Sequence, residues 1–116
     1  MSNNAVMAAT EPLRSLAFGS ISGAYAAVGT PFANPCRMLT LQNFTDQQMF
    51  FSDDSTVSAG KWTLPSGGQM VLDYEANKTE TGGALAYPQG TQIYVKQASA
   101  PSSGSVYVGV TYGRNG

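Results

Sequence analysis

The sequence contains no histidine, and this absence excludes much of the usual catalytic chemistry. Without histidine, a Ser/His/Asp or Cys/His nucleophile system cannot be assembled, and zinc or copper sites lose their commonest ligand. The single cysteine, Cys36, cannot form an intrachain disulfide. Its place beside Pro35, at the start of an apolar run, favours a small buried residue over a reactive thiol. We therefore expect no enzyme, no catalytic residues, no metal site and no cofactor.

Charge is also scarce in this chain. Charged residues make up 11% of the 116 residues, and the net charge is −1, whereas about a quarter of the residues in a typical domain are charged. The six basic residues are spread along the chain, so no cluster predicts a nucleic-acid partner. A weakly charged polar coat favours a surface that other chains cover, although neutral, Ser/Thr-rich sandwiches also occur as secreted domains. We expect a homo-oligomer that binds other proteins.

Long apolar runs are absent as well. No run approaches the length that crosses a bilayer, and the opening residues MSNNAVMAATEPLR carry neither a basic n-region nor an apolar h-region. The sequence therefore predicts no membrane partner and no export through a signal peptide.

What the chain does contain is a series of short runs with a period of two, broken by Gly, Pro and Asn. The one helix-like stretch, GAYAAVG, is short and lies between Gly23 and Gly29, which predicts an all-β fold. Strands are expected at residues 13–18, 37–44, 47–52, 60–64, 69–75, 91–97 and 105–112, with a shorter one in 84–87. Two runs alternate best, and the faces expected to line the core are Met70, Leu72 and Tyr74, and Val106, Val108, Val110 and Tyr112.

Proline and glycine mark the connections between these strands. The stretch GTPFANP places two residues before prolines, and LPSGG and TGG supply turns. Seven to eight strands at this spacing predict a single β-sandwich over residues 13–116, with jelly-roll or Greek-key wiring both open. Residues 1–12 show no pattern of their own. We expect them to form an extended N-terminal arm that contacts outside the sandwich hold in place.

The stretch MFFSDDST sets two aromatic rings before the adjacent carboxylates Asp53 and Asp54. Neighbouring residues on a strand point to opposite faces, so the pair cannot act together as glycosidase acids while the backbone is extended. Structural calcium, with Asp46 and Ser55 as further ligands, is an alternative, but the spacing lacks the pattern of a dedicated calcium loop. We favour a turn that these side chains close by bonding the local backbone. Phe50 and Phe51 should then face opposite sides.

Aromatic residues leave a second class of function open. β-Sandwiches often stack sugars on exposed rings, and the candidates are Trp62, Tyr74, Tyr87, Tyr94, Tyr107 and Tyr112. Tyr74 and Tyr112 share phase with apolar residues, which favours a core or interface role for most of these rings. A carbohydrate-binding module therefore remains an alternative.

Three segments resemble a group of small structural proteins encoded by tailed bacteriophages. They are ISGAYAAVGTP, NFTDQQMFFSDD and GTQIYVKQASAPSSGSVYVGVTYG, within a similarity that extends over about residues 14–113. The resemblance carries no catalytic motif. It implies a virion component with a β-sandwich fold, without placing the protein on the capsid shell or at the neck.

Together these observations predict a non-enzymatic virion structural protein, most simply a capsid decoration or cement subunit. Its expected partners are the major capsid protein or other virion proteins, and its location is the virion, assembled in the cytoplasm of the bacterial host. A subunit that binds only the assembled lattice stabilises it by mass action, and an oligomer strengthens the contact. A neck or collar ring subunit is the alternative within this class. The side chains expected at interfaces are Met49, Phe50, Phe51, Met70 and Tyr107.

Overall fold

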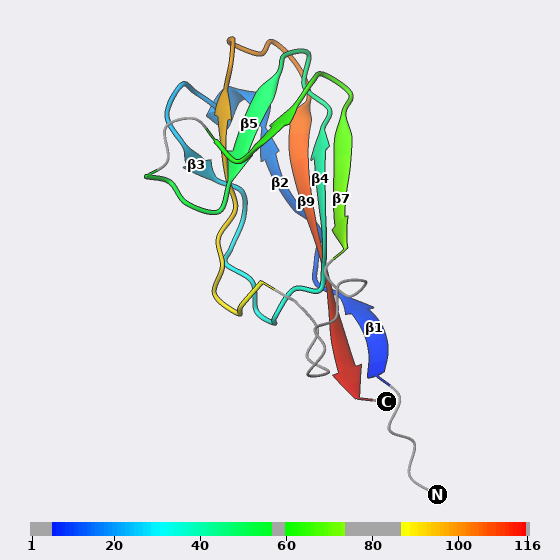
Figure 1. Cartoon of the computed structure of the whole chain (residues 1–116). Coiled ribbons are helices and arrows are strands. Elements are labelled where there is room, and N and C mark those ends of the chain that lie inside the picture. Colours follow the sequence, from blue (N-terminus) through cyan, green and yellow to red (C-terminus); the bar gives the residue numbers. More distant parts are fainter. Residues whose placement is uncertain (1–5, 57–59, 74–86, 116) are drawn as a thin grey trace, which may run out of the picture.

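Two antiparallel sheets face each other in the computed structural model, which describes residues 6–56, 60–73 and 87–115 (Figure 1). Sheet A contains β1 (Val6–Thr10), β2 (Arg14–Ala17), β4 (Met38–Asn43), β7 (Gln69–Asp73) and β9 (Ser105–Asn115). Sheet B contains β3 (Ala26–Ala27), β5 (Met49–Ser52), β6 (Trp62–Leu64) and β8 (Tyr94–Gln97). A single 3₁₀ turn, Phe18–Ser20, follows β2 in this part of the chain. The predicted all-β sandwich is confirmed.

The strand order decides the wiring that the sequence left open. β2 pairs with β9 and β4 with β7 in sheet A, while β3 pairs with β8 and β5 with β6 in sheet B. The chain is thus arranged like one long hairpin whose tip is β5–β6 and whose arms are rolled into two sheets. Within each sheet, one further pairing joins two of these pairs side by side: β9 pairs with β4 in sheet A, and β8 pairs with β5 in sheet B. This is the eight-strand arrangement of a jelly roll, to which β1 is added.

The core lies between the sheets and is built from alternate residues of the strands. In β4, buried and half-buried residues alternate, so that Leu39 and Leu41 point inward. Val106, Val108 and Val110 of β9 are buried against them, which confirms three of the four residues predicted for this core face. The fourth, Tyr112, is half-buried and lies opposite Ala9 of β1. The partly buried residues Met70 and Leu72 of β7 pack against the same core, whereas Tyr74 lies outside the described residues.

The N-terminal segment differs from expectation. Its residues 6–10 form β1, which pairs with the C-terminal half of β9 from Val6↔Asn115 to Thr10↔Thr111. Figure 1 shows β1 and the end of β9 extending together beyond the body of the sandwich. The arm is extended, as expected. We expected it to form no strand and to be held by contacts outside the sandwich, but it forms β1 and pairs with the last strand of its own chain. Pairing through backbone hydrogen bonds needs no apolar pattern, which is why the sequence gives no sign of it.

β1 and β2 are two halves of one strand that is interrupted by a bulge. Thr10 faces Thr111, but Arg14 faces Val108, so the three residues 11–13 lie opposite the two residues 109–110. The Glu11 N–H still donates to the Val110 carbonyl, at 3.0 Å. An extra residue of this kind bends an edge strand away from its neighbour, and it sets the direction in which β1 leaves the sandwich.

Two short segments, GAYAAVG and residues 84–87, form little regular structure in the described part of the chain. The stretch GAYAAVG contributes β3, a strand of only two residues, at Ala26–Ala27. Of the strand expected in 84–87, residues 84–86 lie outside the described part, and Tyr87 forms an isolated bridge with Cys36.

Candidate interaction surfaces

The predicted turn after β5 is present, and of the two adjacent carboxylates it is Asp54 that closes it. The Ser52 hydroxyl accepts from the Asp54 N–H and donates to the Asp54 carbonyl, while Asp54 Oδ1 accepts from the N–H and hydroxyl of Thr56. These two hydrogen bonds from Thr56 hold the pKa of Asp54 below its usual value. Asp53 turns the other way, and Lys61 Nζ lies 2.7 Å from its Oδ1. In the described residues, no three His, Cys, Asp or Glu side chains gather as a metal site would require.

The segment NFTDQQMFFSDD also builds the loop that closes one end of the sandwich. Asn43 is fully buried, and its amide donates to the carbonyls of Gln47, Leu64 and Pro65. Its Oδ1 accepts from the N–H and hydroxyl of Thr45. The buried amide thus joins β4, its following loop and the end of β6, which gives the first half of this motif a structural role.

The third quoted segment meets the second at the same end. Asp46 accepts from both the N–H and the hydroxyl of Ser102, and these bonds lower the pKa of the Asp46 carboxyl. Gly104 has a φ of 91°, and a Cβ there would lie 2.0 Å from the Phe44 carbonyl oxygen. Only glycine fits this position. These residues of the second and third segments therefore hold the loop after β4 against the loop before β9.

Cys36 is buried and matches its predicted structural role. Its Sγ lies 3.2 Å from the Met38 carbonyl oxygen, and burial raises the pKa of the thiol to about 11. A thiol that stays protonated at neutral pH is a poor nucleophile.

Sheet A buries an ion pair at the bulge. Arg14 Nη2 donates to Glu11 Oε1 at 2.6 Å, and both side chains are more than nine-tenths buried. The same guanidinium donates from Nε to the Thr30 carbonyl and from Nη2 to the Pro31 carbonyl. Its stem packs on Gly29, where a Cβ would lie 2.7 Å from Arg14 Cγ. Arg14 therefore connects the start of β2 to the crossing loop GTPFANP.

The Glu11 carboxylate completes this tie from the other side. It accepts from the Ala33 N–H, the Asn34 N–H and the Asn34 side-chain amide. Burial acts to raise the pKa of Glu11, but the hydrogen bonds from Arg14, Asn34 and Ala33 outweigh it and leave the pKa below its ordinary value. The charge is thus stabilised inside the fold. Sequence reasoning missed this pair, since its partners come from a loop that follows some 20 residues later.

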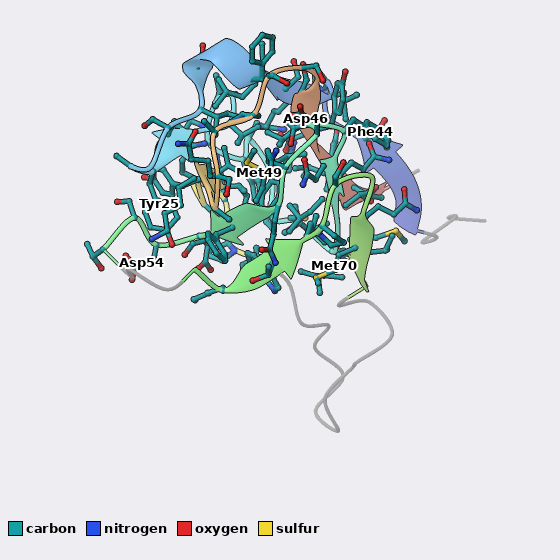
Figure 2. All side chains as sticks on the ribbon, turned by 90° about the horizontal axis from the view of Figure 1, so that it is seen from above. Tyr25, Phe44, Asp46, Met49, Asp54 and Met70 are labelled. Carbon is teal, nitrogen blue, oxygen red and sulfur yellow. The ribbon has the colours of Figure 1, made fainter. Side chains whose placement is uncertain are left out.

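The five predicted interface side chains fall into two groups. Met49 and Phe51 have no exposed area and lie in the core between the sheets. Their contacts are therefore made within this chain. Figure 2 shows Met49 in the interior. Phe50 points to the opposite side from Phe51, as predicted, and is half-buried. Met70 is half-buried at the rim of the core, and Tyr107 is half-buried on the outside of sheet A. The surface candidates reduce to Phe50, Met70 and Tyr107.

The outer surface of sheet B, here called outer face B, combines aromatic rings with a cation. Its members are Tyr25, Phe50, Thr63, Tyr94 and Lys96. Lys96 Nζ lies 4.7 Å from the centre of the Tyr25 ring and 5.9 Å from that of Phe50. Tyr25 also meets Tyr94 edge to face, with ring centres 6.4 Å apart. The positive charge is therefore held in place over rings.

The outer surface of sheet A, here called outer face A, has a different character. Its described side chains are uncharged, and they are Leu13, Met38, Thr40, Gln42, Phe44, Gln69, Val71, Tyr107 and Thr111, around the backbone of Gly109. The register also places Asp73, the last residue of β7, at an outward position opposite Met38. Leu13 is 62% exposed, and Phe44 and Val71 are each 51% exposed. The Phe44 ring leans on Tyr107, with centres 5.6 Å apart. Figure 2 places Phe44 and Tyr25 on opposite sides of the molecule, with Met49 between them.

Trp62 is not a free platform for a sugar. It packs against the core and meets Tyr87 edge to face at 6.2 Å, and Tyr87 in turn meets Phe32 at 6.5 Å. The ring that the sugar-binding alternative would use first is therefore partly buried and already in contact with another ring of this chain.

Comparisons with protein-family models, with curated proteins and with solved structures give no match. Within the described residues, no helix has the length and apolar character of a membrane span.

Proposed function

We propose that this chain is a non-enzymatic virion structural subunit of a tailed bacteriophage, and specifically a capsid decoration or cement protein. The observation that carries the proposal is outer face A. Its described side chains are uncharged, and three large apolar ones, Leu13, Phe44 and Val71, are at least half exposed. An exposed patch of this kind favours association with another protein.

Two further features support the proposal. The three resemblance segments contribute β3, β5, β8 and most of β9 together with the loops beside them, which suits a scaffold whose role is to hold its shape. The chain is also weakly charged, so burial of its surface in an assembly removes few charges from water. Stabilisation of a particle would then follow from mass action, since a subunit that binds only the assembled form shifts the equilibrium toward it.

The test uses phage particles from which the protein has been removed. Purified wild-type chain should rebind in saturable fashion and raise the temperature at which the particles release their DNA. Leu13→Asp should bind more weakly, because it places a charge on outer face A, whereas Thr63→Asp on outer face B should bind normally. Electron microscopy of the rebound label then separates the capsid shell from a neck ring. Failure of the wild-type chain to bind any part of the particle would contradict the proposal.

A carbohydrate-binding module is the second candidate, and outer face B is the observation that favours it. Tyr25, Phe50 and Tyr94 supply rings, and Lys96 supplies a donor. This version predicts saturable binding of purified chain to a cell-surface polysaccharide that Tyr94→Ala removes and Trp62→Phe retains. Binding that survives Tyr94→Ala would count against it.

A further inference from the structure

The bulge between β1 and β2 opens a groove on outer face A. The groove has a volume of about 650 Å³ and is lined by Thr10, Glu11, Pro12, Leu13, Thr40, Gln42, Gly109, Val110 and Thr111. Two features create it. The extra residue in 11–13 moves the chain away from β9, and Gly109 leaves the floor between Thr40 and Leu13 without a side chain. The groove is therefore a product of the bulge and one glycine.

Leu13 forms part of the wall of this groove and projects from it into solvent. Leu13 is 62% exposed, and its Cδ1 lies 3.8 Å from the position that a Cβ of Gly109 would take. A knob and a hole thus lie next to each other on one face. A surface that pairs with its own copy about a twofold axis must be complementary to itself, since each contact occurs twice with the roles exchanged, and a projecting side chain and a hollow on one face meet this condition. Leu13 of each copy would enter the groove of the other.

Charge favours a second copy as the occupant. When a face packs on its own copy about a twofold axis, each charge near the axis meets a charge of the same sign, which is unfavourable. Outer face A keeps this penalty small near the groove, because the described side chains there are uncharged and Glu11 is neutralised by Arg14 below the surface. The acidic residue at an outward register position, Asp73, ends β7, the edge strand farthest from the bulge. If outer face B packed on its own copy instead, Lys96 of one copy would lie near Lys96 of the other. The same comparison disfavours a strongly charged partner for outer face A.

We propose that outer face A is a self-association surface, in which Leu13 of one copy fills the groove over Gly109 of a second copy. This inference rests on the proposed function and names a second subunit as the partner for outer face A, so that Leu13→Asp would weaken particle binding by removing the contact between subunits. The dimer places two jelly rolls back to back through their A sheets, with the β1–β9 extensions at the ends of the paired surface. The apolar exposure of Leu13 and Val71 is then covered.

Analytical ultracentrifugation of the full chain over a range of concentrations tests the proposal. The wild type should show a reversible dimer. Leu13→Asp should raise the dissociation constant by about tenfold or more, which corresponds to about 1.4 kcal/mol. Thr63→Asp is the matched control, since it puts the same charge on an exposed strand residue of outer face B, and it should leave the dimer intact. Circular dichroism checks that each variant melts cooperatively.

Gly109→Val separates association from folding. Its Cβ would meet no atom closer than 3.5 Å, and valine suits a strand better than glycine, so the monomer should melt at the same or a higher temperature. The same side chain fills the groove, so the dimer should weaken by about tenfold. If Gly109 mattered only for folding, the variant would not weaken the dimer while keeping or raising the melting temperature of the monomer.

Three results would overturn the inference. They are a wild type that stays monomeric up to about 0.5 mM, a dimer that neither Leu13→Asp nor Gly109→Val weakens, and a dimer that Thr63→Asp weakens equally. Particle binding is measured separately, so the two proposals fail separately. A monomeric chain that binds particles through Leu13 would refute self-association alone, whereas a dimer that binds no particle would refute the virion role alone.

Discussion

The two sheets of this sandwich place their ion pairs in different positions. Sheet A buries Glu11 and Arg14 below the bulge, where groups of the crossing loop supply further hydrogen bonds to both side chains. Sheet B keeps Lys61 and Asp53 at its margin, with the lysine side chain 46% exposed. The outer faces follow the same division, since outer face A shows no charge among its described side chains and outer face B carries Lys96.

This difference indicates what each region does for the protein. A charge that is neutralised inside the fold stabilises the first strand and leaves the surface above it free for apolar contact. A charge at the margin contributes to solubility and little to stability. Sheet A is thus suited to being covered, and sheet B to facing solvent.

The largest expected effect compares the two ion pairs. Arg14→Leu should lower the free energy of unfolding by about 3–5 kcal/mol, because it leaves the buried Glu11 carboxylate without its cation. Lys61→Met should cost at most about 1 kcal/mol, since its pair with Asp53 is partly screened by water. Urea denaturation of both variants measures the difference. Equal losses would show that the two pairs do not differ in the way that their burial indicates.

The next effect compares Gly60, in the connection before β6 of sheet B, with Gly109, in β9 of sheet A. Gly60 has a φ of 74°, and a Cβ there would lie 3.0 Å from Phe50 Cβ, so Gly60→Ala should cost about 1–2 kcal/mol. Gly109→Ala has room and ordinary strand geometry, and it should be neutral or stabilise by up to about 1 kcal/mol. Thermal unfolding followed by circular dichroism compares them. A loss of stability in Gly109→Ala would mean that the groove floor is tighter than its contacts indicate.

A smaller effect appears in acid. The folded pKa of Glu11 lies below its ordinary value of 4.5, so the charged carboxylate stabilises the fold above that pH, and this contribution is lost as the pH falls through the folded pKa. Denaturation between pH 7 and pH 3 should show a shallower decline in Glu11→Gln than in the wild type. Asp46 and Asp54 are retained in both proteins, so the difference reports Glu11. Parallel curves would contradict the assignment.

The smallest effect concerns the cation on outer face B. Lys96→Gln removes the contacts with Tyr25 and Phe50 and should lower stability by about 0.5–1 kcal/mol. Because outer face B is not the proposed association surface, the dimer should be unchanged in ultracentrifugation. A monomeric Lys96→Gln variant with a normal melting temperature would move the association surface to sheet B.

Much of the fold was predictable because strands leave a local signal. Seven expected strands correspond to β2 and β4 to β9, and the inward face of Val106, Val108 and Val110 follows from alternation alone. The turn at Asp53 and Asp54 was predictable for the same reason, since its hydrogen bonds span two residues. β1 was not, because VMAAT pairs through its backbone with residues at the other end of the chain.

The candidate surfaces were less predictable than the fold. Alternation placed Phe50 and Phe51 on opposite sides, but it could not say which ring faced the core, and it gave no reason to separate Met49 from Phe50 as interface residues. That choice depends on which side of β5 the other sheet covers. Leu13 was read as the start of a strand, and its exposure follows from the bulge, which requires the register of β9 on both sides of residues 11–13.

By itself, the sequence determined the class of protein: an all-β chain with weak charge and without the histidine that most catalytic and zinc sites need. Composition and period-two alternation are local properties, and they act at short range. Only the tertiary structure decided the jelly-roll order, the pairing of β1 with β9, the burial of Glu11 with Arg14, and the groove beside Leu13. Each of these depends on contacts between residues far apart in the chain, whose partners are selected when the two sheets close on a common core.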